Sequence, residues 1–171
     1  MAKCNELCFR GNPDWRQTQA VTVSVLGSHE YNAKVAKLSH KVGKIIAKVG
    51  ATLVCGGLGG VMEHVSRGAK DAGGMTIGLL PGKNKGDANP YIDIALPTSI
   101  GYARNACIAC SADVVVALPG SYGTESEICY AIVYGRPVID MGGWGIKGMI
   151  KVKNIDDFER VLKQTIKKVR S

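Results

Sequence analysis

The sequence predicts an α/β protein built on a doubly wound parallel sheet with helices on both faces. Along residues 21–169, β-branched runs typical of strands alternate with segments that have helical spacing of apolar residues. Several of the strand runs are almost wholly apolar, which indicates that both faces of the sheet are covered. Glycine-containing loops follow three of these runs, and we expect those loops to cluster at the carboxyl edge of the sheet.

The first half of the chain gives three of the expected strands. Short β-branched or apolar runs occur at residues 21–28, which end in Gly27-Ser28, at residues 51–57, which end in two glycines, and at residues 75–82, where the strand ends at Pro81. Residues 33–49 have apolar side chains at positions 35, 38, 42, 45, 46 and 49, which is the spacing of a helix. A second helix is predicted over residues 61–74, where two glycines close it.

The second half repeats the alternation after a polar, turn-rich loop at residues 83–91. We expect strands in residues 92–96, 112–118 and 136–143, and helices over residues 100–112, 126–135 and 155–169. The last helix has Asp156 and Asp157 in its first turn and lysines in its last, as the helix dipole favours.

Length and composition are those of one globular domain. The chain has 171 residues, of which 46% are hydrophobic and 21% charged. We expect residues 1–19 to be an N-terminal extension and residues 20–171 to form a single nucleotide-binding domain. The apolar runs are too short to cross a bilayer, and the first residues lack the apolar core of a secretion signal. We therefore expect a cytoplasmic protein with no membrane partner.

The charge balance is basic. The 22 Lys and Arg exceed the 14 Asp and Glu by eight, and much of the excess lies in residues 147–170. We interpret that stretch as a solvated helix face and a basic tail rather than a nucleic-acid site, because no recognition motif accompanies it. A spread basic surface also attracts small phosphorylated ligands.

Six cysteines are expected to be reduced thiols, since the chain is neither short nor secreted. Cys107 and Cys110 form a C-x-x-C within a helical stretch of small residues, where Cys behaves as a small hydrophobe. Together with Cys4 and Cys8 they leave a four-thiolate zinc or iron–sulfur site open as an alternative. We favour structural thiols and expect no metal site.

Two glycine-rich loops, the first within residues 54–62 and the second within residues 118–127, are the strongest indication of a binding site, because glycines let backbone N–H groups approach an anion at a helix start. The alternative is that these glycines only make tight turns. The candidate ligand-binding residues, grouped by the strand run that they follow, are Gly27 and Ser28, then Gly56, Gly57, Gly59 and Gly60, then Gly120, Ser121, Tyr122, Gly123 and Thr124. Phosphate is the expected ligand group. Tyr102, Tyr122 or Trp144 are candidates for stacking on a ring of the phosphorylated ligand.

Other familiar sites do not fit the spacing. Neither loop reads G-x-G-x-x-G, and no Walker A motif occurs, which argues against a dinucleotide dehydrogenase and a P-loop NTPase. Gly120-Ser121-Tyr122-Gly123 lacks the residue between Gly and Ser that a nucleophile elbow has. The three histidines have no metal-ligand spacing.

Arg104 and Glu127 are the candidate charged groups near these loops. Arg104 lies at the start of the predicted helix that precedes the second loop, where it either points toward the strand ends or forms a salt bridge at the helix end. Glu127 follows Thr124 by three residues, so the two side chains share one face of a helix.

Three motifs in this order resemble the Lonely Guy family and its relatives: residues 56–62 (GGLGGVM), Arg104-Asn105, and residues 119–127 (PGSYGTESE). That superfamily, long labelled "possible lysine decarboxylase", also includes molybdenum cofactor carrier proteins and a branch related to the DNA-processing protein Smf. The resemblance covers residues 21–165. It implies a Rossmann-like homodimer or higher homo-oligomer.

The resemblance also implies a chemistry. Lonely Guy enzymes cleave the N-glycosidic bond of nucleoside 5'-monophosphates to base and ribose 5-phosphate, and their catalytic Arg and Glu correspond to Arg104 and Glu127. Two positions depart from the family pattern, since Ser121 replaces a Gly and Asn105 replaces a Lys. Residues 74–96, with their short polar loop, resemble the carrier-like branch more than the cytokinin-activating enzymes.

Two functions follow from the resemblance. In the first, the loops bind a nucleoside monophosphate, and Glu127 supports an oxocarbenium-like transition state while Arg104 orients the phosphate or ribose. In the second, the protein is a non-catalytic carrier of molybdenum cofactor, whose pterin ends in a phosphate. The sequence ranks hydrolysis narrowly first. Neither function requires a further cofactor, and a nucleotide sensor or DNA-associated module is a third reading that rests on charge alone.

Overall fold

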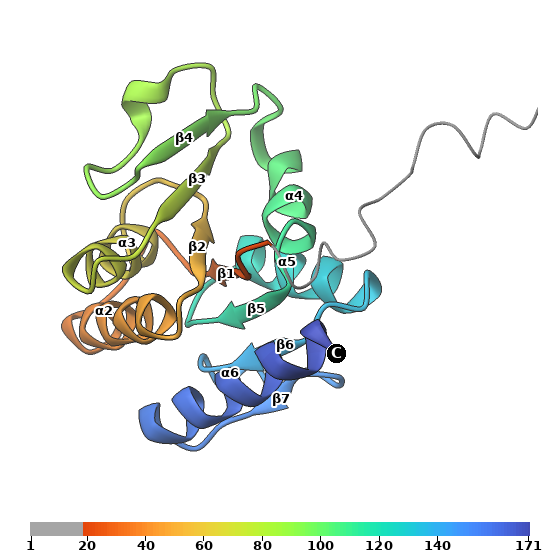
Figure 1. Ribbon diagram of the computed structural model, residues 1–171. Coiled ribbons are helices and arrows are strands. Elements are labelled where there is room, and N and C mark those ends of the chain that lie inside the picture. The colour runs from red at the N-terminus through yellow and green to blue at the C-terminus, as the bar shows by residue number, and fades with distance from the viewer. Residues whose placement is uncertain (1–18) are drawn as a thin grey trace, which may run out of the picture.

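A seven-stranded sheet forms the centre of the computed structural model, which describes residues 19–171 (Figure 1). The strand order is β4-β3-β2-β1-β5-β6-β7, and every neighbouring pair is parallel. The strands are β1 (Thr22–Leu26), β2 (Thr52–Cys55), β3 (Thr76–Leu80), β4 (Ile94–Pro97), β5 (Val114–Ala117), β6 (Val138–Asp140) and β7 (Ile150–Lys151). The predicted parallel α/β fold is confirmed.

Helices cover both faces of this sheet. Two cores are buried between helices and sheet, one beneath α2, α3 and α6 and the other beneath α4 and α5. In Figure 1, α2 and α3 lie to the left of β1 and β2, whereas α4 and α5 lie to the right. The helices are α2 (Ala33–Lys48), α3 (Val61–Asp71), α4 (Arg104–Cys110), α5 (Tyr122–Val133) and α6 (Ile155–Arg170), and the short 3₁₀ turns are η1 (Lys85–Asp87) and η2 (Gly101–Ala103).

The central strand β5 shows why an apolar run gives a doubly covered sheet. Val114 and Val116 belong to the core beneath α2, α3 and α6, while Val115 and Ala117 belong to the core beneath α4 and α5. All four side chains are 0% exposed. Each fully buried valine contributes about 1.5–3 kcal/mol, so this four-residue strand is held from both sides.

Side-chain caps fix where two of the outer helices begin. The Oδ1 atom of Asn32 accepts hydrogen bonds from the backbone N–H groups of Lys34 and Val35 at the start of α2. At the start of α6, Asn154 accepts a hydrogen bond from the N–H of Asp157. Such caps typically stabilise a helix by about 1 kcal/mol. Helix α5 begins without a side-chain cap, which matters for the site described below.

Two elements differ from the sequence-based expectation. Residues 150–151 form the edge strand β7, where a solvated helix face was expected, because two residues are too few to show a strand period. Helix α5 begins at Tyr122 and not at residue 126, because Gly123 suggested a turn but is accommodated in the first helical turn. Residues 1–18, including most of the expected extension, lie outside the described residues. Within residues 19–171, no helix is long and apolar enough to cross a membrane.

The chain changes direction across the sheet between β1 and β5. The connection after β1 leads to β2 on one side, whereas β4 at the far edge connects back to β5 on the other side of β1. Loops on neighbouring strands therefore diverge at this point and leave a crevice beyond the carboxyl ends of β1 and β5. The candidate site residues lie around that crevice.

Candidate functional site

A cavity of about 550 Å³ lies at the carboxyl ends of β1, β2 and β5. Its walls come from the β1–α2 loop, the β2–α3 loop, the start of α4 and the start of α5. Of the residues predicted from the sequence, eight line it: Gly27, Ser28, Gly56, Arg104, Ser121, Gly123, Thr124 and Glu127. The structure thus brings together both glycine loops and both predicted charged groups, which are up to 100 residues apart in the chain.

Ser28 ties the two glycine loops to each other through its backbone. Its N–H donates to the carbonyl of Pro119 at 3.3 Å, and its carbonyl accepts from the N–H of Val61 at 3.0 Å. Gly27, just before it, packs so closely on Val61 that an added Cβ would lie 2.4 Å from that side chain. The β1–α2 loop therefore fixes the spacing between the start of α3 and the second glycine loop.

The remaining glycines of the first loop shape it and do not line the cavity. Gly57 and Gly60 have φ values of 73° and 70°, a left-handed conformation that favours glycine. A Cβ at Gly60 would lie 2.4 Å from the carbonyl oxygen of His29, and one at Gly59 would lie 2.9 Å from the same residue's ring. Gly59 and Gly60 therefore allow the first glycine loop to pack against the β1–α2 loop, and Gly57 allows it to pack against Gly78 and Leu80 of β3. For these three glycines the tight-turn interpretation is the better one.

Asn89, which the sequence analysis did not single out, holds the first glycine loop from below. Its side-chain amide donates to the carbonyls of Gly57 at 3.2 Å and Leu58 at 2.9 Å, and its backbone N–H donates to Gly57 at 2.8 Å. The residue is 8% exposed. Buried polar contacts of this kind set one loop conformation, because breaking them leaves unpaired groups in the interior. No sequence motif predicts this contact, because it joins positions that are over 30 residues apart in the chain.

The second glycine loop leads into the uncapped start of α5. Ser121 is the N-cap residue, but its side chain makes no capping hydrogen bond. In the described part of the chain, the N–H groups of residues 122–124 have no acceptor. Thr124 is 3% exposed and lines the cavity, while Gly120 lies against it. The first turn of α5 therefore presents free N–H donors and a positive dipole end beside the cavity.

Arg104 forms the cationic floor of the cavity. It is 7% exposed, and neither its Nε nor its Nη1 atom has a hydrogen-bond partner among residues 19–171. The guanidinium lies against Gly56, where an added Cβ would meet Nη1 at 2.2 Å. Burial lowers the pKa of Arg104, and the neighbouring Glu127 raises it in return. A buried guanidinium with free donors is costly unless an anion satisfies it.

Glu127 faces the same cavity from the second turn of α5 and is 7% exposed. Burial raises its pKa from 4.5 to about 8, although Arg104 acts to lower it. Within the described residues, the two groups form no ion pair within 4.0 Å. At neutral pH the carboxyl group is therefore mostly protonated, and Arg104 has an uncompensated charge.

Cys55 lies beneath the first glycine loop and is 0% exposed. Its sulfur accepts a hydrogen bond from the N–H of Gly57 at 3.4 Å and lies 3.6 Å from the hydroxyl oxygen of Ser66. Burial raises the pKa of this thiol. Cys55 is therefore a packed structural thiol and not a nucleophile.

Five residues that were not candidates also line the cavity, namely Val25, His29, Glu30, Leu58 and Met62. Their adjacency in the chain to predicted site residues is the one signal that could have found them. Asn105 of the Arg104-Asn105 motif lines the cavity as well. Of the candidate stacking residues, Tyr102 lines the cavity and is 89% exposed. Tyr122 is equally exposed but does not line it. Trp144 packs elsewhere, where its Nε1 donates to the carbonyl of Leu118 at 3.0 Å.

The thiols of the C-x-x-C pair lie on α4, with Cys107 exposed and Cys110 half-buried. Among residues 19–171, no group of three or more Cys, His, Asp or Glu side chains is placed to hold a metal ion. Cys4 and Cys8 lie outside the described residues, so the four-thiolate alternative stays a hypothesis.

Comparisons with known proteins extend over nearly the whole domain. A molybdenum cofactor binding protein from Rippkaea orientalis is 32% identical, with a TM-score of 0.82, and the match covers 87% of this chain and 99% of that one. The molybdenum cofactor carrier protein of Chlamydomonas reinhardtii is 28% identical, with a TM-score of 0.79 and the same coverage. DNA processing protein A from Helicobacter pylori, at 18% identity over 90% of this chain and 85% of its own, has a TM-score of 0.66 and shares the fold.

One curated relative is an enzyme. The cytokinin riboside 5'-monophosphate phosphoribohydrolase of Mycobacterium tuberculosis is 30% identical over 142 residues, which cover 77% of this chain and 73% of its own. Similarity to both the carrier proteins and a Lonely Guy enzyme confirms the resemblance seen in the motifs. The structural relatives favour the carrier alternative over hydrolysis. The SLOG cluster4 family model matches residues 20–170, and the chain belongs to that family.

Proposed function

We propose that this protein binds molybdenum cofactor, or a closely related phosphorylated pterin, in the cavity between its two glycine loops and does not convert it chemically. The observation that carries the proposal is the buried, unpartnered guanidinium of Arg104 on the cavity floor. A guanidinium binds phosphate through paired N–H donors, which is the contact that Arg104 leaves unmade.

The first turn of α5 supplies the complementary donors. The free N–H groups of Gly123 and Thr124 and the Thr124 hydroxyl belong to residues that line the same cavity as Arg104. A terminal phosphate placed between them satisfies donors from two elements at once, and the helix dipole adds further attraction. A volume of about 550 Å³ lies within the usual range for small-molecule sites, which leaves room for the rings of a pterin.

Relatives named for molybdenum cofactor binding support this choice of ligand, since they match the chain over 99% of their own length. The protonation state of Glu127 supports ligand binding without catalysis over hydrolysis. With its pKa raised to about 8, the carboxyl group is mostly protonated at pH 7. A neutral carboxyl group donates a hydrogen bond to a ligand oxygen but does not stabilise an oxocarbenium ion by charge.

Copurification tests the proposal. The protein is expressed in a host that makes molybdenum cofactor and is purified without oxygen. Its molybdenum is then measured by elemental analysis, and its pterin by fluorescence after oxidation. We expect both with wild type and neither with Arg104→Gln. Arg136→Gln is the matched control, because Arg136 also has a buried, unpartnered Nε but lies away from this cavity. Equal pterin content in wild type and Arg104→Gln would contradict the proposal.

Hydrolysis of nucleoside 5'-monophosphates is the second candidate, because Arg104 and Glu127 share one cavity. Incubation with a panel of these nucleotides, followed by chromatography of free base and ribose 5-phosphate, tests it. Release that is lost in Glu127→Gln and kept in Glu125→Gln would support the enzyme and displace the carrier. Glu125 is an exposed carboxylate on the same helix and serves as the control.

A further inference from the structure

The positive charge of the protein is gathered on one face. Helix α2 and residues 151–170 together carry twelve Lys and Arg but only three Asp and Glu. Helices α2 and α6 pack over the same core, so these two segments form one surface. The other described segments carry seven basic and nine acidic residues. The fold therefore places the basic helix α2 beside the basic C-terminal stretch that the sequence analysis singled out.

The lysines of α2 form a regular row. They stand at positions 34, 37, 41, 44 and 48, alternately three and four residues apart, so they follow one side of the helix. At 1.5 Å per residue the row is about 21 Å long, with a positive charge about every 5 Å. Lys44 is half-buried and the other four are exposed. Helix α2 contains no acidic residue, and among residues 19–171 none of the five lysines has an acidic partner within 4.0 Å.

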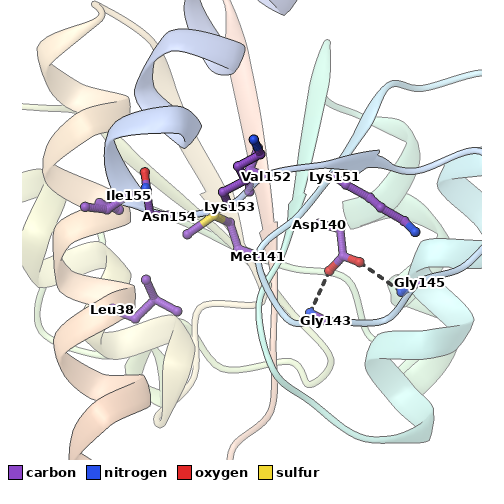
Figure 2. Close-up of a pocket in the computed structure, with 10 residues that line it drawn as sticks. All are labelled: Leu38, Asp140, Met141, Gly143, Gly145, Lys151, Val152, Lys153, Asn154 and Ile155. Carbon is purple, nitrogen blue, oxygen red and sulfur yellow. Dashed lines mark hydrogen bonds between the residues drawn. The ribbon is translucent and has the colours of Figure 1, made fainter.

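A hollow of about 450 Å³ lies between this helix and the chain leading into α6 (Figure 2). Leu38 of α2 forms one side, and Lys151 and Lys153 line the other. The carboxylate that lines it, Asp140, is 7% exposed and accepts hydrogen bonds from four loop N–H groups at residues 142–145, two of which are drawn in Figure 2. These hydrogen bonds direct the Asp140 carboxylate toward the loop, so the lysines determine the charge at the surface of the hollow.

The composition of this face separates the candidate partners. The large apolar side chains that are exposed in the described chain all lie outside α2 and residues 151–170. A stable protein interface needs an apolar or aromatic centre, and a membrane-binding helix needs apolar side chains to insert. Nucleic-acid interfaces are more polar and much more positively charged. A row of about 21 Å spans about six phosphates of one strand along a duplex.

We propose that the face formed by α2 and residues 151–170 binds the phosphate backbone of nucleic acid without reading its sequence. Side chains that contact phosphates position a protein on a duplex, whereas base contacts specify the sequence, and lysines alone supply the first kind. This inference does not depend on the function of the cavity.

Fluorescence anisotropy with labelled duplexes of unrelated sequence tests the proposal across a salt series. The row variant is Lys37→Gln, Lys41→Gln and Lys48→Gln. The control variant, Lys83→Gln, Lys85→Gln and Lys147→Gln, removes the same charge from exposed positions elsewhere. Three lost phosphate contacts lower the salt slope by about 2.7, so wild type loses about 40-fold more affinity than the row variant between 50 and 200 mM salt. The control variant is expected to keep the wild-type slope.

Three outcomes would overturn the proposal. In the first, wild type does not bind duplex at 50 mM salt. In the second, the row variant and the control variant lose the same duplex affinity. In the third, the lysine row is needed for binding to anionic vesicles or polyglutamate, and the protein does not bind duplex. A third variant, with arginine at positions 37, 41 and 48, is expected to bind as wild type does. It separates a loss of charge from a loss of folding, together with circular dichroism of each protein.

Discussion

Glu127 makes the stability of the ligand-free protein depend on pH in a defined direction. Burial raises its pKa from 4.5 to about 8 in the folded state, so the folded protein binds this proton more tightly than the unfolded chain does. Unfolding therefore becomes easier as pH rises from 4.5 through 8, and the effect is complete about one unit above pH 8. The full difference of 3.5 pKa units corresponds to about 5 kcal/mol, of which about 4 kcal/mol is lost between pH 5 and pH 8.

Urea denaturation of wild type and Glu127→Gln at several pH values between 5 and 9 measures this effect. The difference in unfolding free energy between the two proteins isolates Glu127, because every other titrating group is common to both. We expect wild type to weaken by about 4 kcal/mol relative to Glu127→Gln over pH 5 to 8. Glu125→Gln, at an exposed position on α5, is expected to follow wild type. A pH-independent difference between wild type and Glu127→Gln would refute the assignment of a neutral Glu127.

Three further predictions concern the floor and walls of the cavity. Arg104→Met removes an unpaired buried charge, so the free energy of unfolding of the ligand-free protein in urea is expected to rise by about 1–3 kcal/mol, while pterin binding is lost. A lower free energy of unfolding would contradict this. Gly56→Ala places a methyl group 2.2 Å from the Arg104 guanidinium and is expected to weaken pterin binding more than tenfold in an equilibrium titration. Gly86→Ala is the control, because the nearest atom to its added methyl group is 3.3 Å away, and it is expected to leave pterin binding unchanged. Asn89→Ala removes three hydrogen bonds of a buried side chain and is expected to lower the thermal midpoint, with a loss of about 1–3 kcal/mol. An unchanged midpoint would show that the first glycine loop holds its shape without Asn89.

The sheet could be predicted because its central strands are covered on both faces. Runs such as Val114 to Leu118 alternate between two cores, so each residue must be apolar, and the pattern is visible in the sequence. The edge strand β7 has two residues, and its pairing with β6 depends on tertiary context. The start of α5 was missed for a similar reason, since helix propensity disfavours Gly123 but the fold tolerates it there.

The candidate site was predictable in outline, because glycines after parallel strands meet at one edge of a sheet. The sequence does not separate glycines that line the cavity, such as Gly56, from those that permit loop packing, such as Gly60. It also does not give the burial of Glu127, which depends on side chains far away in the chain. That burial weakens the argument for hydrolysis, which the sequence alone ranked first.

The central claim is that Arg104 holds the phosphate of a pterin ligand, and a comparison of the phosphorylated pterin with its dephosphorylated form tests it most directly. Dissociation constants for both forms are measured without oxygen on wild type and on Arg104→Gln. We expect loss of the phosphate to weaken binding to wild type by about 10- to 100-fold and to weaken binding to Arg104→Gln much less, because only the donors of α5 then contact the phosphate. The same loss of affinity in both proteins would contradict the account, since the phosphate would then be held elsewhere.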